Sequence, residues 1–562
     1  MIDQLKAGAH NVPLQSERTG CRIHQQGIQR EIQMKKYNSA VWMEKVEQGI
    51  KQGPYTDTWE SLSEHETPRW FRDAKFGIFI HWGLYSVPSF NNEWYSRNMY
   101  VEGTPEYQHH LETYGKQKDF GYKDFIPLFK AEKFDADAWA ELFKNSGARY
   151  VVPVAEHHDG FQMYKSDLSD WNAFDRGPHR DFTGELTEAL RRKGLINGAS
   201  SHRIEHWWFM SPGKLPLADG TPASEWSDVP EGSKECGDFY WPAVLRDSEN
   251  NDNRYLTPYP SKEFVEDWMF RTIEIIDRFQ PQELYFDWWV YHDAVKPYMR
   301  KVLAYYYNKG AEWGKEVMVI TKNDGIPYGC AVPDVERGGF DEPQPNAWQT
   351  DTAIGKNSWC YTTNNVYKTP TVILYDLIDA VSKNGTMLLN VGPKPDGTFT
   401  EEDTNVLLSI GQWLSANGEA VYGSRPWRIS GEGPTAAKKG AFADQIDTAY
   451  TSEDFRFTVN HGHLYVFAMN YPEPEAHLCA GNCGTGTDSG KTGYGNVYSE
   501  IRVKSLAGRM HPGVSEFAEL IRDIDVCGSD EKPVWFQTEE ALVIRTKKIR
   551  SKDPVVFRIR FR

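Results

Sequence analysis

Ionisable side chains gather where the apolar runs of this sequence end. The run VVPVA (151–155) stops at Glu156, His157, His158 and Asp159. Other apolar runs end in the same way, at His81, at Ser201 with His202 and Glu205 close behind, at Asp287 and at Lys322. Carboxylates and imidazoles so placed can transfer protons, attack an electrophilic carbon or bind a metal ion. In a barrel of parallel strands the carboxyl ends meet at one mouth, so we expect these residues to share a site.

Asp287 is the strongest candidate for a reacting group. Its neighbours in the chain are Phe286, Trp288 and Trp289, and a carboxylate among such side chains is costly to desolvate unless it is hydrogen-bonded or used. The alternative is a structural role as a helix cap. Cleavage of a glycoside needs two carboxyl groups, one to attack the anomeric carbon and one to protonate the leaving oxygen. The loop 334–348 offers four candidates for the second: Asp334, Glu336, Asp341 and Glu342.

A zinc hydrolase is a different interpretation of the same histidines. Zinc sites on a first barrel strand typically use two histidines separated by one residue, whereas the run ending at His81 has one. His157 and His158 point to opposite faces if their strand continues through them. Cys479 and Cys483 have no second pair at zinc spacing. We therefore expect no metal and no cofactor, with a metal-dependent hydrolase as the least favoured alternative.

The overall composition excludes several classes of partner. Net charge is −16 over 562 residues without acidic runs, so the protein repels nucleic-acid backbones and anionic lipid surfaces. No stretch approaches the roughly 20 apolar residues of a membrane span, and the first 33 residues lack the apolar centre of a signal peptide. The seven scattered cysteines suit a reducing compartment. We therefore expect a cytoplasmic location, with residues 1–35 as a polar tail.

Short apolar runs alternate with amphipathic helical patterns from about residue 70 to 420. This alternation predicts strands at 75–82, 149–156, 195–201, 283–289, 316–322 and 386–392, and helices at 135–148, 182–193, 261–279, 293–308, 371–383 and 402–416. No glycine-rich phosphate turn follows any strand, so a (β/α)8-like barrel over 36–427 is favoured over an open sheet. Alternating patterns such as VVFRIRFR (555–562) then predict a C-terminal antiparallel β-sandwich over 428–562.

Six segments in one order carry a resemblance to a known family. They are AKFGIFIHWGLYSVPSFNNEWY (74–95), EHHDGF (156–161), LYFDWW (284–289), WQTDTAIGKNSWCY (348–361), AVSKNGTMLLNVGPKPDG (380–397) and IGQWLSANGEAVYGSRPW (410–427). Together they resemble the α-L-fucosidases of glycoside hydrolase family 29 over roughly residues 68–427. The resemblance implies a barrel followed by a β-sandwich, and a retaining mechanism with Asp287 as nucleophile. It also implies a fucose-binding set of His81, Glu93, Trp94, His157, His158 and Trp359.

Three departures from the family pattern affect the site. Glu156 stands where many members have a lysine before the histidine pair, and SSHRIEHWW (200–208) replaces a tyrosine motif, so we expect His202 to take over that contact. Gly325 stands where an arginine is common, and Lys322 is the expected substitute. Aligning DVERG with the family's glutamate makes Glu336 the expected acid/base, with Glu342 next.

The expected function is that of a retaining, exo-acting α-L-fucosidase that releases L-fucose from fucosylated oligosaccharides or glycoconjugates. A fucose-binding protein without catalysis on the same fold is the main alternative. The oligomeric state, including a homo-oligomer, stays open, as does the role of the β-sandwich.

Overall fold

The computed structural model describes residues 37–210, 239–241, 259–322, 325–436, 438–445, 448–477, 496–508 and 520–562. The predicted polar tail, together with Cys479 and Cys483, lies outside these residues.

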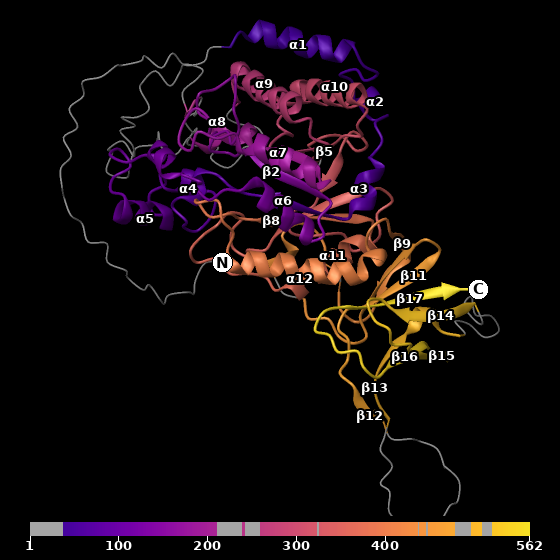
Figure 1. Cartoon of the computed structure of the whole chain (residues 1–562). Helices are drawn as coiled ribbons and strands as arrows, with labels where there is room; N and C mark the ends of the chain where they lie inside the picture. Colours follow the sequence, from indigo (N-terminus) through magenta and orange to yellow (C-terminus); the bar gives the residue numbers. More distant parts are fainter. Residues whose placement is uncertain are drawn as a thin grey trace, which may run out of the picture. The chain divides into compact units, whose positions relative to one another are not determined.

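Eight parallel strands close into a barrel in chain order, with β1 paired to both β2 and β8. The predicted (β/α)8-like barrel is therefore confirmed (Figure 1). Its strands are β1 (Phe76–Ile80), β2 (Tyr150–Glu156), β3 (Ile196–Ser201), β4 (Glu283–Phe286), β5 (Met318–Lys322), β6 (Val332–Asp334), β7 (Trp348–Ala353) and β8 (Gly385–Val391).

Amphipathic helices surround the strands and begin at capping residues that the sequence makes visible. Asp135 caps its helix by accepting a hydrogen bond from the backbone of Ala138, and Trp139 and Phe143 of that helix are buried. The helices are α1 (Ser39–Lys51), α2 (Trp59–Leu62), α3 (Arg69–Ala74), α4 (Tyr95–Asn98), α5 (Pro105–Thr113), α6 (Ala136–Asn145), α7 (Phe182–Lys193), α8 (His206–Phe209), α9 (Lys262–Phe279), α10 (Lys296–Trp313), α11 (Pro370–Ser382) and α12 (Glu401–Asn417).

The sequence patterns predict neither β6 nor β7, which lie at the two ends of the stretch 334–348 interpreted as a loop. Strand β6 has three residues and contains a proline, while β7 is rich in polar residues. Those polar residues are buried inside the barrel, where Tyr150 donates a hydrogen bond to Gln349 and Tyr285 donates one to Asp351. A hydrophobic pattern could not reveal a strand whose inward face is polar.

The expected strand at 283–289 is shorter in the structure. Strand β4 ends at Phe286, so Asp287 and the two tryptophans after it lie in the turn that follows. Trp289 has a φ of 79°, an uncommon conformation for a bulky residue that marks this turn as tightly constrained. The chain then enters α10 at Lys296 rather than near 293.

The C-terminal region forms two antiparallel sheets, in agreement with the predicted sandwich. The strand orders are β14-β17-β11-β10-β9 and β12-β13-β16-β15. Phe457, Val466, Ile544 and Phe557 contribute to their shared apolar core. The strands are β9 (Arg425–Glu432), β10 (Phe455–Asn460), β11 (His463–Ala468), β12 (Glu475–His477), β13 (Asn496–Val503), β14 (Ile521–Val526), β15 (Val534–Gln537), β16 (Leu542–Thr546) and β17 (Val555–Phe561).

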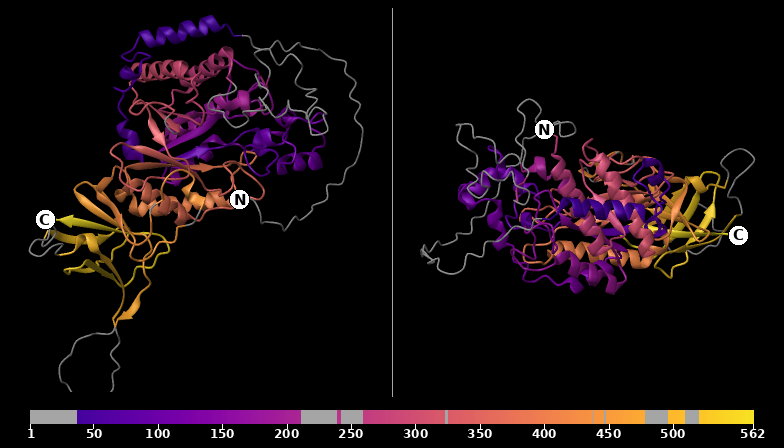
Figure 2. Two further views of the ribbon diagram at one scale, coloured as in Figure 1. Left: turned by 180° about the vertical axis from the view of Figure 1, so that it is seen from behind. Right: turned by 90° about the horizontal axis from the view of Figure 1, so that it is seen from above.

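The first of these sheets packs on barrel helices α11 and α12 (Figures 1 and 2). Trp413 of α12 donates its indole hydrogen to the carbonyl of Pro554 at 2.9 Å, and Arg456 of β10 pairs with Asp379 of α11 at 2.7 Å. Among the described residues, no helix combines the length and apolar character that a membrane span needs.

Candidate active site

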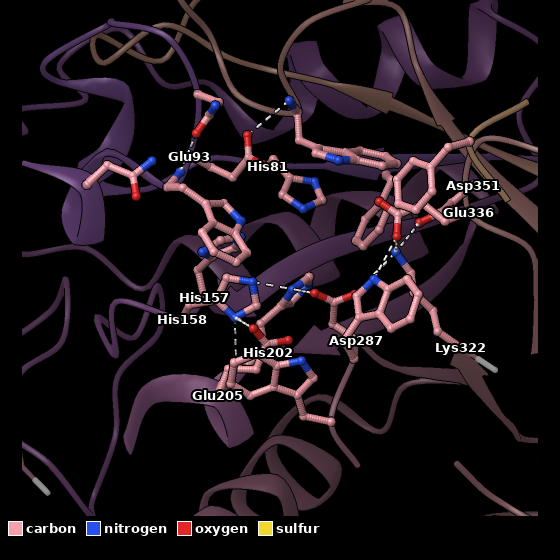
Figure 3. Close-up of a pocket in the computed structure, with 18 residues that line it drawn as sticks. His81, Glu93, His157, His158, His202, Glu205, Asp287, Lys322, Glu336 and Asp351 are labelled. Atoms are coloured by element: carbon pink, nitrogen blue, oxygen red, sulfur yellow. Dashed lines mark hydrogen bonds and ion pairs between the residues drawn. The ribbon is translucent and has the colours of Figure 1, made fainter. Parts of the chain in front are cut away.

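The carboxyl ends of the barrel strands open into a cavity of about 530 Å³ (Figure 3). The ten residues expected to catalyse the reaction or to bind fucose all line it: His81, Glu93, Trp94, His157, His158, His202, Asp287, Lys322, Glu336 and Trp359. Glu342, the second choice for the acid, is exposed and is not among the lining residues. Residues that are far apart in the chain therefore meet in one site.

Four imidazoles form one wall of the cavity. The ring of His157 lies 5.6 Å from that of His81, 4.2 Å from that of His158 and 4.8 Å from that of His202, measured between centroids. Burial lowers the pKa of His158 to about 3, and it lowers the pKa values of His81 and His157 well below the usual range. These three rings are therefore neutral at neutral pH and can exchange hydrogen bonds with hydroxyl groups.

The expectation that His157 and His158 point to opposite faces does not hold. Strand β2 ends at Glu156, so the alternation of a strand no longer governs the two residues that follow. Both side chains reach the same cavity.

The orientation of His81 is set by a residue that the sequence analysis missed. The Nδ1 of His81 lies 2.6 Å from Oδ1 of Asn390 on β8, and the amide of Asn390 donates to the carbonyl of Trp359 at 2.6 Å. Because an amide oxygen only accepts, His81 carries its proton on Nδ1, and its Nε2 is an acceptor.

Among the residues that the structure describes, two groups of side chains are close enough to hold a metal ion. Within each group, one ligand atom per residue lies within 4.8 Å of the others: His81, His157 and His202 form one group, and His158, His202 and Asp287 the other. Within the described part of the chain, His157 Nδ1 and His202 Nε2 are buried without a hydrogen-bond partner. Such atoms suit a metal ion or the hydroxyl groups of a sugar equally well.

A group of buried charges, here called the arginine cluster, holds the end of β2. It consists of Glu156, Arg203, Asp267 and Arg271. Arg271 donates to Glu156 at 2.9 Å and lies 2.8 Å from Asp267, which also accepts from Arg203 at 3.1 Å. The cluster thus ties β2 to α9 and to the turn after β3, directly beside the histidine pair.

A second group, the lysine cluster, consists of Asp287, Lys322, Glu336 and Asp351. The ammonium of Lys322 lies 2.7 Å from Glu336, 3.2 Å from Asp287 and 3.2 Å from Asp351. Glu336 also accepts a hydrogen bond from the indole of Trp288 at 2.7 Å, and Asp287 lies 3.1 Å from Nδ1 of His202. Figure 3 shows Glu336, Lys322 and Asp351 on one side of Asp287, with the imidazoles on the other.

Within the lysine cluster, Asp287 and Glu336 have pKa values that are shifted in opposite directions. Burial alone raises the pKa of Asp287, but the charge of Lys322 and the contact with His202 outweigh it and hold this pKa well below its usual range. Burial raises the pKa of Glu336 to about 7 against the opposing charge of Lys322. An ionised carboxylate therefore lies beside a carboxyl group that can hold a proton near neutral pH, which is the pairing of a nucleophile and an acid.

Glu93, Trp94 and Trp359 complete the wall on the side of His81. Glu93 is buried and accepts a hydrogen bond from the backbone of Trp359 at 3.1 Å. The indole of Trp359 is 5.3 Å from the ring of His81, and that of Trp94 is 6.1 Å from the ring of His158. These aromatic faces can cover apolar parts of a ligand.

Comparisons with known proteins agree with this arrangement. The model of the family described as Alpha-L-fucosidase matches residues 42–419. The tissue alpha-L-fucosidase of Bos taurus is 34% identical over 396 residues, which cover 67% of this chain and 74% of that protein. The tissue alpha-L-fucosidase of Homo sapiens is 32% identical over 413 residues, which cover 68% and 75%.

The fold matches solved structures over nearly its whole length. The crystal structure of Thermotoga maritima alpha-fucosidase in complex with a mechanism-based inhibitor aligns with a TM-score of 0.65 and 27% sequence identity. The alignment covers 90% of this chain and 99% of that one. The chain therefore belongs to the alpha-L-fucosidase family and is a glycoside hydrolase of that family.

Proposed function

We propose that the protein is a retaining, exo-acting α-L-fucosidase that releases L-fucose from fucosylated glycans by double displacement. The observation that carries the proposal is that Asp287 and Glu336 share the ammonium of Lys322 while differing in protonation. A cavity of about 530 Å³ with neutral imidazoles on one wall suits one terminal sugar.

The separation of the two carboxyl groups supports retention. Asp287 Oδ1 and Glu336 Oε2 lie 3.2 and 2.7 Å from the same nitrogen. They are therefore no more than about 6 Å apart, below the roughly 6.5 Å at which the range of inverting enzymes begins. Retaining enzymes place these groups about 5 to 5.5 Å apart.

In the first step, Asp287 attacks the anomeric carbon while Glu336 gives its proton to the glycosidic oxygen, whose bond to that carbon breaks. A covalent fucosyl ester of Asp287 remains. In the second step, Glu336 takes a proton from water, which attacks the anomeric carbon and releases fucose with its original configuration. The negative charge moves from Asp287 to Glu336 and back, and Lys322 lies beside both, so its charge is not left unpaired at either stage.

The nucleophile is tested by Asp287→Gly. This variant is expected to lose nearly all turnover of a nitrophenyl fucoside and to regain part of it with added azide. The product should be a fucosyl azide of inverted configuration, identified by NMR. Unchanged turnover without azide would contradict the role of Asp287, and a wild-type protein that binds fucose but releases no nitrophenol would indicate a binding protein instead.

A further inference from the structure

One connection of the β-sandwich crosses to the catalytic mouth of the barrel. It joins β9 to β10, and one described segment of it, residues 438–445, lies along the loop that carries Glu336. Gly339 and Gly440 exchange two backbone hydrogen bonds, of 3.2 and 2.8 Å. The backbone of Phe442 donates to the carbonyl of Glu336 at 2.8 Å. The proposed acid therefore sits in a loop that is paired, residue by residue, with a segment of the other domain.

The close approach depends on a glycine. A Cβ added to Gly338 would lie 1.8 Å from the carbonyl oxygen of Gly440, a distance that no side chain can occupy. Because Gly338 has no side chain, the segment 438–445 can approach the backbone two residues after Glu336.

Asp444 anchors the far end of the segment in the barrel. This carboxylate is 8% exposed, pairs with Lys368 and with Arg337 at 3.3 Å, and accepts from Thr352 of β7 at 2.9 Å. Arg337 in turn lies 4.5 Å from the centre of the Trp359 ring, which lines the cavity. These buried contacts fix the segment relative to both the acid loop and the sugar wall.

Phe442 lines the cavity although the residue is 48% exposed. Its φ of 58° is uncommon for an aromatic residue, and it persists because hydrogen bonds fix the backbone on either side. Apolar burial within the protein therefore does not account for its position. A half-exposed aromatic ring at the mouth of a cavity is suited to contact a ligand.

We propose that Phe442 forms the binding site for the leaving group, where it stacks on the apolar face of the sugar to which fucose is attached. The inference rests on the proposed function. Glu336 must reach the glycosidic oxygen, so the sugar beyond that oxygen lies on the side of Glu336, where Phe442 is. Trp288, in the turn after β4, donates to Glu336 and lines the same cavity. The substrate class is then a fucoside of a pyranose sugar whose ring presents C–H bonds on one face.

The test compares two substrates that share fucose and differ in leaving group. α-L-Fucosyl fluoride carries a leaving group too small to touch Phe442, whereas a fucosylated disaccharide carries a full sugar ring. For Phe442→Ala, we expect the loss of kcat/KM on the disaccharide to exceed the loss on the fluoride by about tenfold. Phe442→Tyr, which keeps an aromatic face, should restore most of the difference.

The matched control is Phe536→Ala. Phe536 is a 38% exposed phenylalanine of β15 in the same domain, and it does not line the cavity. This variant should keep the wild-type ratio between the two substrates. Equal losses on both substrates for Phe442→Ala would overturn the proposal, because a lost contact with the leaving sugar cannot slow cleavage of the fluoride. A loss confined to the disaccharide that Phe442→Tyr does not restore would also overturn it, because that result indicates a role in positioning Glu336, whose proton the fluoride does not need. A wild-type protein inactive on the fluoride would contradict the proposed function itself, so the two failures are distinguishable.

Discussion

The arginine cluster and the lysine cluster are both buried groups of four charged side chains beside the barrel mouth, but they differ in charge balance. The arginine cluster holds two cationic side chains and two carboxyl groups. The lysine cluster holds one cationic side chain, Lys322, and three carboxyl groups. The arginine cluster is closed off from the cavity, and Tyr37 donates to its Asp267 at 2.9 Å. All four members of the lysine cluster line the cavity.

A raised pKa alone does not identify a catalytic acid in this protein. Burial raises the pKa of Glu156 in the arginine cluster to about 7, as it does for Glu336 in the lysine cluster. What separates the two is that Glu336 has an excess of neighbouring carboxylates and faces the cavity. A surplus of carboxyl groups over cations favours retention of a proton, and access to a ligand allows that proton to be used.

The largest expected effect comes from removing the acid of the lysine cluster. Glu336→Gln should lower kcat/KM on a fucosylated disaccharide about 10²- to 10⁴-fold, the usual contribution of a general acid. The loss should be smaller on an aryl fucoside, whose leaving group needs little protonation. Steady-state kinetics on both substrates measures the two losses.

Glu342→Gln is the matched control for that prediction, since Glu342 is exposed in the same loop and does not line the cavity. It should stay within about twofold of the wild type, because an exposed carboxylate outside the site contributes little to the barrier. A large loss for Glu342→Gln, with Glu336→Gln near the wild type, would reverse the assignment of the acid.

Breaking the arginine cluster should affect stability first. Arg271→Met leaves Glu156 and Asp267 buried with one cation fewer, and removal of one partner of a buried pair typically destabilises by about 3 to 5 kcal/mol. The free energy of unfolding, measured by urea denaturation with fluorescence and circular dichroism, should fall accordingly.

Arg192→Met is the control for this loss. Arg192 pairs with Asp137 on the surface at 2.8 Å, and exposed pairs contribute about 0 to 1 kcal/mol. Equal stability of the two variants would show that the arginine cluster does not hold the end of β2.

Much of the site could be predicted from the sequence, because several of its residues stand directly after the apolar runs that form the barrel strands. Asp287 and Lys322 each follow an apolar run directly, and barrel geometry brings strand ends together wherever they fall in the chain. The resemblance to a family added Glu93, Trp94 and Trp359, which no strand-end argument would have found. The cytoplasmic location and the boundaries of the domains stay predictions.

The rest depends on contacts that leave no local pattern. Asp351 lies inside strand β7, whose polar inward face hides it from a hydrophobic pattern, and Asn390 orients His81 from the neighbouring strand β8. Phe442 reaches the cavity from the other domain across a pair of glycines. Each of these requires knowledge of which distant backbone lies alongside, and a single sequence does not contain it.

Activity should depend on pH, because the active form needs Asp287 ionised and Glu336 protonated. Glu336 loses its proton as the pH rises through about 7, so kcat/KM on a disaccharide should fall above that value, about tenfold for each further pH unit. Asp287 has a pKa well below its usual range, so no acidic limb is expected near pH 4. A pH profile from 3 to 9 measures both limbs, and a decline on the acidic side near pH 6 would contradict the split protonation.

Metal removal should have the smallest effect, although the imidazoles beside the lysine cluster could hold an ion. In the proposed mechanism the positive charge beside the reacting carboxylates is that of Lys322, at 3.2 Å from Asp287 and 2.7 Å from Glu336. The His81, His157 and His202 side chains are then left to bind the sugar, so dialysis against EDTA and 1,10-phenanthroline should leave kcat/KM unchanged. Loss of activity that returns with one equivalent of zinc would instead assign the histidine group to catalysis. Glu336 of the lysine cluster would then still supply the proton, but the metal ion and not Lys322 would stabilise the charge of the transition state. The two clusters would then differ only in their access to the cavity.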